Sequence, residues 1–417
     1  MKNVLFLFRS YADLDHMVPL LHKALTTRKI HPIVACTNID FDFTNDFRIK
    51  HIKSIQNVNI DYLFNYNEKQ VRVLLLNITQ LLILRATFFH KIPLVLKTLL
   101  KLRFMLIKQK QNTSNWFASI CKQFQIRTVV VDFTNENRTI YSTISSVCAS
   151  NQIPVIGVPH GFDFADNTFW TNDALEKQNK SRMGENWGWI NHLLVPSTAI
   201  KNKYSSLGLK KKNITSLGSP RFCQEWMQIY HSLVGTSSIY KDPSKLKVLY
   251  IDHSSIYRAN PDSIVETLSA INTLGCTDLK IKPHIRALKN SLLSDERMYS
   301  VGSIDDSHTI HLIQWADVVI NCISSVILEA LYLNKIFMYP SYFNQNDMRW
   351  SKFGSCWEIK SKHELINALS NIFSGDYDLP YNQTDIDHFF ESEIYAGDRN
   401  NDVLGNYIEH IFATTDI

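Results

Sequence analysis

Short apolar runs of strand length alternate with longer helical patterns along the chain, and this alternation constrains the fold more than any other feature of the sequence. In the first half, strands are expected at residues 4–8, 32–35, 128–132, 154–158 and 192–195. Repeated strand-helix-strand units build parallel sheets that helices cover on both faces. The sequence therefore predicts an α/β fold.

The chain is long enough for two domains. It has 417 residues, 45% of them hydrophobic, which exceeds the usual size of a single core. A basic stretch at residues 201–212 runs into Gly218-Ser219-Pro220, where glycine and proline interrupt the pattern. We place the boundary there, with an N-terminal Rossmann-like domain at 1–220 that carries a helical insertion at about 61–111, and a C-terminal one at 221–417.

The alternation resumes in the second domain. Strands are expected at residues 247–252, 279–283, 298–301, 317–321 and 336–339. Helices are expected at residues 261–274, 308–315, 324–333, 362–373 and 385–410. Whether the last helix crosses back to the first domain is left open.

Composition excludes several classes of protein. Lys plus Arg number 44 against 39 Asp plus Glu, too small a surplus for a nucleic-acid-binding face. The seven cysteines are scattered without zinc spacing, which fits reduced thiols in a cytoplasm. The glycine-rich motifs of NAD enzymes and P-loop NTPases do not occur.

The most apolar stretch, residues 71–107, is interrupted by basic residues and falls short of the roughly 20 apolar residues of a membrane span. Core helices are the favoured interpretation. A helix lying on an anionic membrane surface is the alternative, and it would place the protein on the cytoplasmic face of the inner membrane.

An apolar strand followed by Ser324-Ser325 predicts an anion site. If these serines open a helix, its free N–H groups and their hydroxyls favour a phosphate. Glu329 follows in the same helix and could reach a ribose. Simple helix capping by serine explains the pattern equally well.

Two further strand ends in this domain carry polar groups. Lys282 and His284 end one strand, where ligands of open α/β sheets bind. Their charges suit a nucleotide phosphate, and His284 could assist a leaving group. Asp252 and His253 end another strand; Asp252 could be a nucleophile or base, or could merely cap the next loop.

In the first domain, a strand ends in Pro159-His160-Gly161, followed by Asp163. Glycine permits a close backbone approach, and His160 could act as a base toward an acceptor hydroxyl or bind substrate. An exposed turn is the alternative.

The carboxylate pairs Asp40/Asp42 and Asp163/Asp166 have metal-site spacing, but such short patterns arise by chance, and no required metal is expected.

Taken in order, Pro159-His160-Gly161, Gly218-Ser-Pro-Arg221, Lys282-Pro-His284 and Ser324-Ser325 with Glu329 resemble GT-B glycosyltransferases of bacterial capsule and lipopolysaccharide synthesis. The resemblance implies two Rossmann-like α/β/α domains facing a central cleft. Within that class, the chain is most similar to β-Kdo transferases, which implies CMP-Kdo as donor, a saccharide or lipid-linked glycan as acceptor, and no cofactor.

The resemblance also implies roles for the candidate residues. Lys282, His253, Ser324, Ser325 and Glu329 would bind the donor nucleotide, and His284 would stabilise its departure. Asp252 would act at the anomeric carbon, as nucleophile or as base.

The same resemblance implies that Arg9 and Asp163 bind the acceptor, and that His160 acts as a base toward it or binds it. Three enzyme alternatives stay open: a sialyltransferase, a CDP-glycerol-type polyol phosphotransferase and a UDP-sugar 2-epimerase-like enzyme. Sialyltransferases usually have His before Pro, whereas this chain has Pro283-His284. A non-catalytic carbohydrate-binding or scaffold subunit is the remaining alternative.

Overall fold

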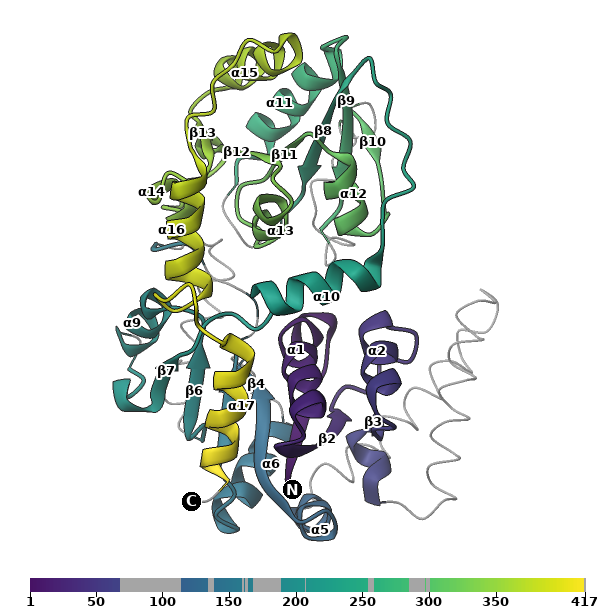
Figure 1. Cartoon of the computed structure of the whole chain (residues 1–417), viewed down its shortest axis with the longest axis vertical. Helices are drawn as coiled ribbons and strands as arrows, with labels where there is room; N and C mark the ends of the chain where they lie inside the picture. The colour runs from purple at the N-terminus through teal and green to yellow at the C-terminus, as the bar shows by residue number, and fades with distance from the viewer. Residues whose placement is uncertain are drawn as a thin grey trace. The chain divides into compact units, whose positions relative to one another are not determined.

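A computed structural model describes residues 1–67, 114–133, 139–159, 161, 164–167, 189–206, 208–253, 259–284, 297 and 301–415. The chain divides into two compact units. Unit 1 comprises Met1–His160, Ser181–Arg221 and Asp402–Ile417, and unit 2 comprises Gly161–Lys180 and Phe222–Asn401. Each unit contains one parallel sheet with helices packed on it (Figure 1).

The sheet of unit 1 is seven-stranded in the described residues, in the order β3-β2-β1-β4-β5-β6-β7. Its strands are β1 Lys2–Phe8, β2 Ile30–Cys36, β3 Ile60–Tyr62, β4 Ile126–Asp132, β5 Val155–Val158, β6 His192–Val195 and β7 Ile214–Ser216. Its helices are α1 Tyr11–Thr27, α2 Phe47–Ile55, α5 Ser114–Gln123, α6 Thr139–Ser150, α9 Thr198–Ser206 and α17 Val403–Thr414, with short 3-10 helices η1 Leu63–Asn67 and η2 Lys211–Asn213.

The sheet of unit 2 is six-stranded in the described part, in the order β10-β9-β8-β11-β12-β13. Its strands are β8 Leu246–Ile251, β9 Thr277–Lys282, β10 Ser303–Ile304, β11 Val318–Ile320, β12 Ile336–Pro340 and β13 Trp357–Ile359. Its helices are α10 Gln224–Val234, α11 Pro261–Thr273, α12 Thr309–Trp315, α13 Ile327–Tyr332, α14 Arg349–Lys352, α15 Lys362–Ser374 and α16 Gln383–Ile394, with the 3-10 helix η5 Ser341–Phe343.

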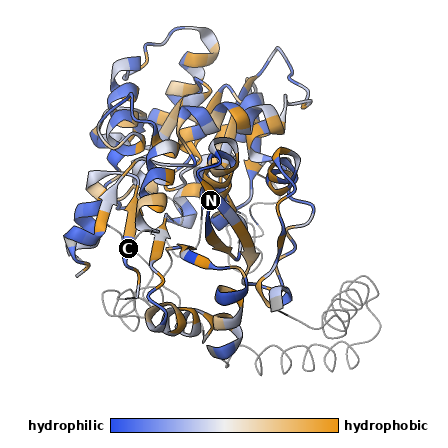
Figure 2. Ribbon diagram, turned by 60° about the horizontal axis from the view of Figure 1, so that its bottom comes forward, coloured by the Kyte–Doolittle hydropathy of each residue, from blue (hydrophilic) through white to orange (hydrophobic). Residues whose placement is uncertain are grey.

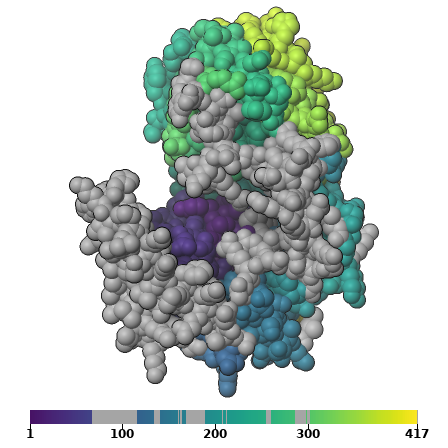
Figure 3. All heavy atoms as spheres, turned by 180° about the vertical axis from the view of Figure 1, so that it is seen from behind, coloured from purple at the N-terminus to yellow at the C-terminus, as the bar shows by residue number. Residues whose placement is uncertain are grey.

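Both sheets are doubly wound, as predicted. All six residues of β8 are buried, because helices cover both faces of the sheet, and a strand in that position needs a continuous apolar run. Figure 2 shows the apolar colouring on the strands and more polar colouring on the helices. On the surface of unit 2, α15 lies against α11 (Figure 3).

In each sheet the strand order reverses at one place, between β1 and β4 in unit 1 and between β8 and β11 in unit 2. The connections on either side of this switch point leave in opposite directions, so the loops diverge and leave room for a ligand at the carboxyl ends of the strands. The polar residues that follow β8 and β11 therefore define where a site should be sought in unit 2.

Three expected elements outside the candidate site differ from those observed. The helix expected at 385–410 is two helices, α16 and α17, and the chain between them has positive φ angles at Ala396 (57°) and Gly397 (94°). Left-handed backbone cannot continue a right-handed helix. Val301 lies in a turn rather than a strand, and β10 begins at Ser303. The insertion expected at 61–111 lies outside the described residues from 68 on, while its first residues form β3 and η1.

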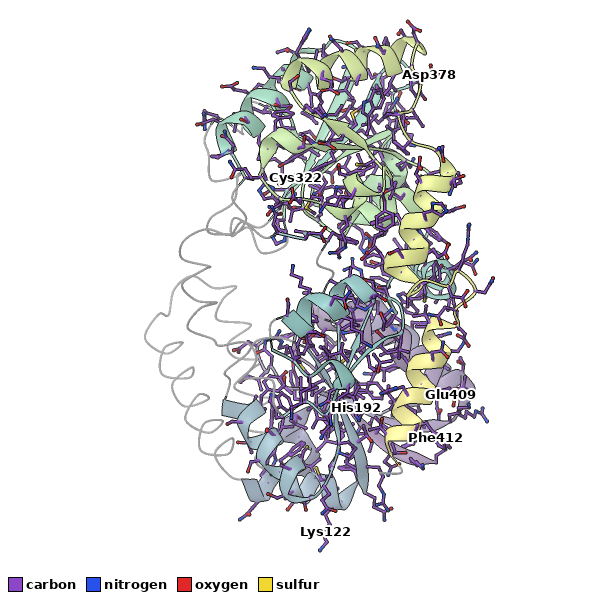
Figure 4. All side chains as sticks on the ribbon, turned by 90° about the vertical axis from the view of Figure 1, so that its left-hand side faces the viewer. Lys122, His192, Cys322, Asp378, Glu409 and Phe412 are labelled. Carbon is purple, nitrogen blue, oxygen red and sulfur yellow. The ribbon has the colours of Figure 1, made fainter. Side chains whose placement is uncertain are left out.

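The last helix, α17, packs within unit 1 against α1. The Tyr407 hydroxyl donates a hydrogen bond to the Gly218 carbonyl at 3.0 Å, and Lys2 Nζ lies 4.2 Å from the ring centroid of Phe412. Figure 4 labels Phe412 on this helix. Helix α17 therefore belongs to unit 1, although the residues before it belong to unit 2.

Candidate active site

The candidate site of unit 2 lies at the switch point of its sheet. Strand β8 pairs with β9 on one side, in the register Ile251 to Lys282, and with β11 on the other, in the register Tyr250 to Ile320. Because parallel strands end at the same edge, Asp252, His284 and Asn321 follow three neighbouring strands at one edge of the sheet. The fold therefore brings these sequence-predicted strand ends together.

Asp252 is buried, with 1% of its surface exposed. Its Oδ1 accepts the backbone N–H of His253 at 2.8 Å, and its own N–H donates to the Lys282 carbonyl at 2.9 Å. Burial raises the pKa of Asp252 to about 6, although the backbone N–H groups of His253 and His284 act in the opposite direction. A carboxyl with such a pKa can give or take a proton near neutral pH.

Asp252→Asn is expected to stabilise the protein at high pH. The pKa of Asp252 is about 6 in the folded chain, against an ordinary value of 3.8. Ionisation therefore lowers the free energy of unfolding, increasingly between these two pH values and fully above pH 6. The variant should gain about 2 to 3 kcal/mol of unfolding free energy at pH 8 and almost nothing at pH 4. Urea unfolding at both pH values measures this difference.

The exposed Asp376 provides the control for that measurement. Asp376→Asn removes a carboxylate without removing a buried charge, so it should change the unfolding free energy equally little at both pH values. An Asp252→Asn variant that behaves like this control would contradict the idea that burial of Asp252 is costly in the ionised form.

His253 is held uncharged. Burial, with a smaller effect of nearby His284, lowers its pKa to about 4. Its Nδ1 lies 3.6 Å from Asp252 Oδ1. As the pH falls from 6.5 toward 4, the unfolded chain binds a proton at this position and the folded chain does not, so His253 costs stability on acidification. A neutral imidazole can still donate one hydrogen bond to a ligand.

Lys282 supplies the cationic group at the same edge. Its Nζ donates to the Asp306 carbonyl at 3.0 Å. Burial lowers its pKa, while the carboxylates of Asp306 and Asp305 act to raise it. Lys280, two residues earlier in β9, is already paired with Asp305 at 2.7 Å. His284 is half-buried.

The turn after β11 is organised by Asn321, a residue that sequence analysis missed. Asn321 is fully buried; its Nδ2 donates to the Ile251 carbonyl at 2.8 Å, and its Oδ1 accepts the N–H groups of Ile323 at 2.9 Å and Ser324 at 2.6 Å. An asparagine after an apolar strand is a recognised turn former, and this was the available signal.

The expected helix start at Ser324 is therefore wrong. Ser324 precedes a turn at residues 325 and 326, and α13 begins at Ile327. The Ser324 hydroxyl accepts the N–H of Val326 at 3.3 Å. Glu329 lies within α13 and is 3% exposed. Ser324 and Ser325 thus lie at the switch point, on a turn that Asn321 fixes rather than on a helix terminus.

Unit 1 carries a buried ionic cluster at its own switch point. Arg9 follows β1, and its guanidinium lies 3.5 Å from Asp13 and 3.2 Å from Asp132, the last residue of β4. The backbone N–H of Arg9 also donates to Asp13 at 2.7 Å. Arg9 is 6% exposed, Asp13 0% and Asp132 4%. Both ion pairs of Arg9 are thus formed with residues of unit 1. Binding of an acceptor by Arg9 remains a prediction.

The other two acceptor-side residues, His160 and Asp163, lie outside the described residues. Residues 164–167, which follow Asp163, belong to unit 2. There the buried Phe164 packs near Trp350, with ring centroids 5.2 Å apart. Asp166 is paired with Lys352 at 2.6 Å and with Arg349 at 3.4 Å. Its carboxylate is thus used in ion pairs.

All seven cysteines are free thiols. Within the described ranges, no group of three or more His, Cys, Asp or Glu residues is placed to hold a metal ion. In those same ranges, the helices are too short or too polar to cross a membrane.

Two doubly wound parallel sheets, each with polar residues at its switch point, define an α/β protein of the GT-B fold, as predicted. No protein-family model matches the sequence. No curated protein matches it either. Similarity is found among solved structures, at sequence identities that establish the fold alone.

The three structures described next are among those that match nearly the whole chain. S. aureus MnaA, solved with UDP, is 13% identical with a TM-score of 0.58, covering 100% of this chain and 97% of its own. The UDP-GlcNAc 2-epimerase from Neisseria meningitidis, bound to UDP-GlcNAc, is 12% identical with a TM-score of 0.53, covering 99% and 100%. The wall teichoic acid polymerase TagF, soaked with CDPG, is 11% identical with a TM-score of 0.52, covering 100% and 89%.

Proposed function

We propose that this chain is an enzyme of bacterial cell-surface glycan synthesis that acts on a nucleotide sugar. The observation that carries the proposal is the convergence of Asp252, Lys282 and the Asn321 turn at the switch point of unit 2. Lys282 and the hydroxyls of Ser324 and Ser325 would bind the phosphates. The fold shared with proteins solved with UDP and UDP-GlcNAc supports this choice of ligand.

The proposed reaction is inversion at C2 of a UDP-N-acetylhexosamine. The likeness to a UDP-GlcNAc 2-epimerase over 99% of this chain supports epimerisation better than sugar transfer. The C2 proton is not acidic by itself, so its removal is coupled to breaking the bond between C1 and the diphosphate oxygen, which releases UDP and leaves a C1=C2 double bond. Return of UDP to C1 and of a proton to the opposite face of C2 gives the epimer, so the reaction needs groups that exchange protons near neutral pH. Asp252, whose pKa is raised to about 6, meets that need. Glu329 would contact the ribose, and His284 would stabilise the leaving phosphate.

A transfer reaction is the second candidate. The likeness to the TagF polymerase, which was soaked with CDPG, favours a CDP-activated polyol as donor over the CMP-Kdo donor first expected. In a transferase, Arg9, His160 and Asp163 would bind the acceptor. A transferase bound to the cytoplasmic face of the membrane would meet a lipid-linked glycan there as its acceptor.

The first experiment identifies the nucleotide. Melting temperatures of the purified protein are compared with UDP, CDP and CMP, because a ligand that binds only the folded state raises the melting temperature. UDP should give the largest rise. A rise with CDP alone would favour the polyol transferase, a rise with CMP alone would restore the Kdo hypothesis, and no rise with any would overturn the nucleotide site.

The second experiment detects the reaction. UDP-GlcNAc is incubated with the enzyme in D₂O, where epimerisation replaces the C2 proton by deuterium and forms the C2 epimer, both visible by ¹H NMR. Intact UDP-GlcNAc without deuterium at C2 would rule out the epimerase. CDP-glycerol with a glycan acceptor, followed by ³¹P NMR of the product, tests the second candidate.

Lys282→Gln is expected to weaken UDP binding about tenfold, because a charge-assisted hydrogen bond to phosphate contributes about 1.5 kcal/mol. Lys280→Gln is the matched control. Lys280 is a lysine of the same strand, but it forms an ion pair with Asp305, so its replacement should leave UDP affinity unchanged. Isothermal titration with UDP measures both variants. Equal affinities for the two would remove Lys282 from the phosphate site.

A further inference from the structure

Two buried side chains of unit 2 have no part in the roles assigned above. Tyr250, in β8, and Cys322, just after β11, are both 0% exposed. The Tyr250 hydroxyl lies 3.5 Å from Nδ1 of His253, and the Cys322 sulfur lies 3.6 Å from the same nitrogen. Figure 4 labels Cys322 inside unit 2. Two groups that can donate hydrogen bonds thus face one ring nitrogen.

Both groups keep their protons at neutral pH. Burial raises the pKa of Tyr250 well above its usual value, and Cys322 and Asp252 act in the same direction. Burial likewise raises the pKa of the Cys322 thiol, again with a contribution from Asp252. A protonated hydroxyl and a protonated thiol can each donate to the ring nitrogen that they face, in the tautomer in which this nitrogen carries no proton.

The carboxyl of Asp252 lies just beyond hydrogen-bonding distance of that nitrogen. Its Oδ1 lies 3.6 Å from Nδ1, whereas a charged N–H···O bond measures about 2.7 to 2.9 Å. The same oxygen already accepts the backbone N–H of His253 at 2.8 Å. His284, a further titratable neighbour within the described residues, disfavours a second proton on the ring. A neutral imidazole that accepts at Nδ1 carries its proton at Nε2.

We propose that Tyr250 and Cys322 are positioning residues that hold His253 as the Nε2–H tautomer, so that this N–H donates a hydrogen bond to the diphosphate of the nucleotide. The ligand part rests on the function proposed above, whereas the tautomer is a property of the free protein. A donor prepared in this way binds an anion without a change of protonation. It also leaves Lys282 as the cation of the described part of the site.

The tautomer is measured without ligand. Two-bond ¹H–¹⁵N correlation spectra at pH 7 distinguish the two neutral imidazole forms, and His253→Gln identifies the signal. The Nε2–H form is expected in the parent protein, with a shift toward Nδ1–H in the double variant Tyr250→Phe/Cys322→Ala. The Nδ1–H form in the parent, or no shift in the double variant, would overturn the proposal.

Matched controls separate this effect from loss of packing. Tyr339→Phe removes another buried hydroxyl of unit 2, which donates to the Asn346 carbonyl at 3.0 Å. Cys356→Ala removes another buried thiol. Both should keep the Nε2–H form, because neither group is among the side chains that face His253 Nδ1 in the described structure.

UDP titration tests the ligand part. His253→Gln places an amide N–H₂ near the position of Nε2 and should keep UDP affinity within about threefold, whereas His253→Asn places it near Nδ1 and should lose about tenfold. Tyr250→Phe/Cys322→Ala should also lose about tenfold. Equal losses for Gln and Asn would refute the donor role, while absence of UDP binding in the parent protein would refute the proposed function and leave the tautomer result standing.

Discussion

Asn321→Ala is expected to lose nucleotide-induced stabilisation almost completely and to unfold more easily. The alanine leaves the Ile251 carbonyl and the N–H groups of Ile323 and Ser324 without the side chain that joins them. Buried backbone groups deprived of partners cost about 1 to 3 kcal/mol each, so we expect a loss of about 3 to 5 kcal/mol in unfolding free energy. UDP affinity should fall by about 100-fold or more, because the turn that we propose binds the phosphates loses its anchor.

Asn382→Ala is the matched control for this experiment. Asn382 also uses its side chain to accept a backbone N–H, that of Asp385 at 3.2 Å, as the N-cap of α16. Its replacement should cost about 1 kcal/mol and leave UDP binding unchanged. If Asn321→Ala is too unstable to titrate, Asn321→Ser keeps a hydroxyl acceptor and should bind UDP with intermediate affinity. Unchanged affinity in both Asn321 variants would disprove a role of this turn in binding.

Arg9→Met is expected to be the most destabilising change in unit 1. It leaves the carboxylates of Asp13 and Asp132 buried without their cation. Removal of one partner from a buried ion pair typically costs about 3 to 5 kcal/mol, because the remaining charge is no longer compensated. Urea unfolding at pH 7 measures the loss. Arg9→Met/Asp132→Asn should recover part of it, because one of the two uncompensated charges is gone.

Lys29→Met gives the comparison for an exposed pair in the same unit. Lys29 pairs with Glu409 on α17, and their side chains are 46% and 54% exposed. Solvent screens such pairs, so the change should cost no more than about 1 kcal/mol. Similar losses for Lys29→Met and Arg9→Met would show that the buried cluster contributes no more than a surface pair. A stable Arg9→Met protein that fails only in transfer would instead support the acceptor role.

The sequence by itself determined the fold class and the central strands. The core of β1 and residues 248–251 of β8 are continuous apolar runs, because strands buried on both faces of a parallel sheet admit little else. Short strands and helix limits were harder to predict. β13 has only three residues, and the break between α16 and α17 depends on left-handed backbone that no periodicity reveals.

For the candidate site, the sequence located Asp252, Lys282 and Ser324 at strand ends, since parallel strands all end at one edge. Only the tertiary structure decided what these groups meet. Arg9 is paired with a carboxylate 123 residues away, and Cys322 faces His253 from 69 residues away. Protonation and hydrogen bonding depend on neighbours and burial, which packing between distant segments creates, so local pattern alone could not assign them.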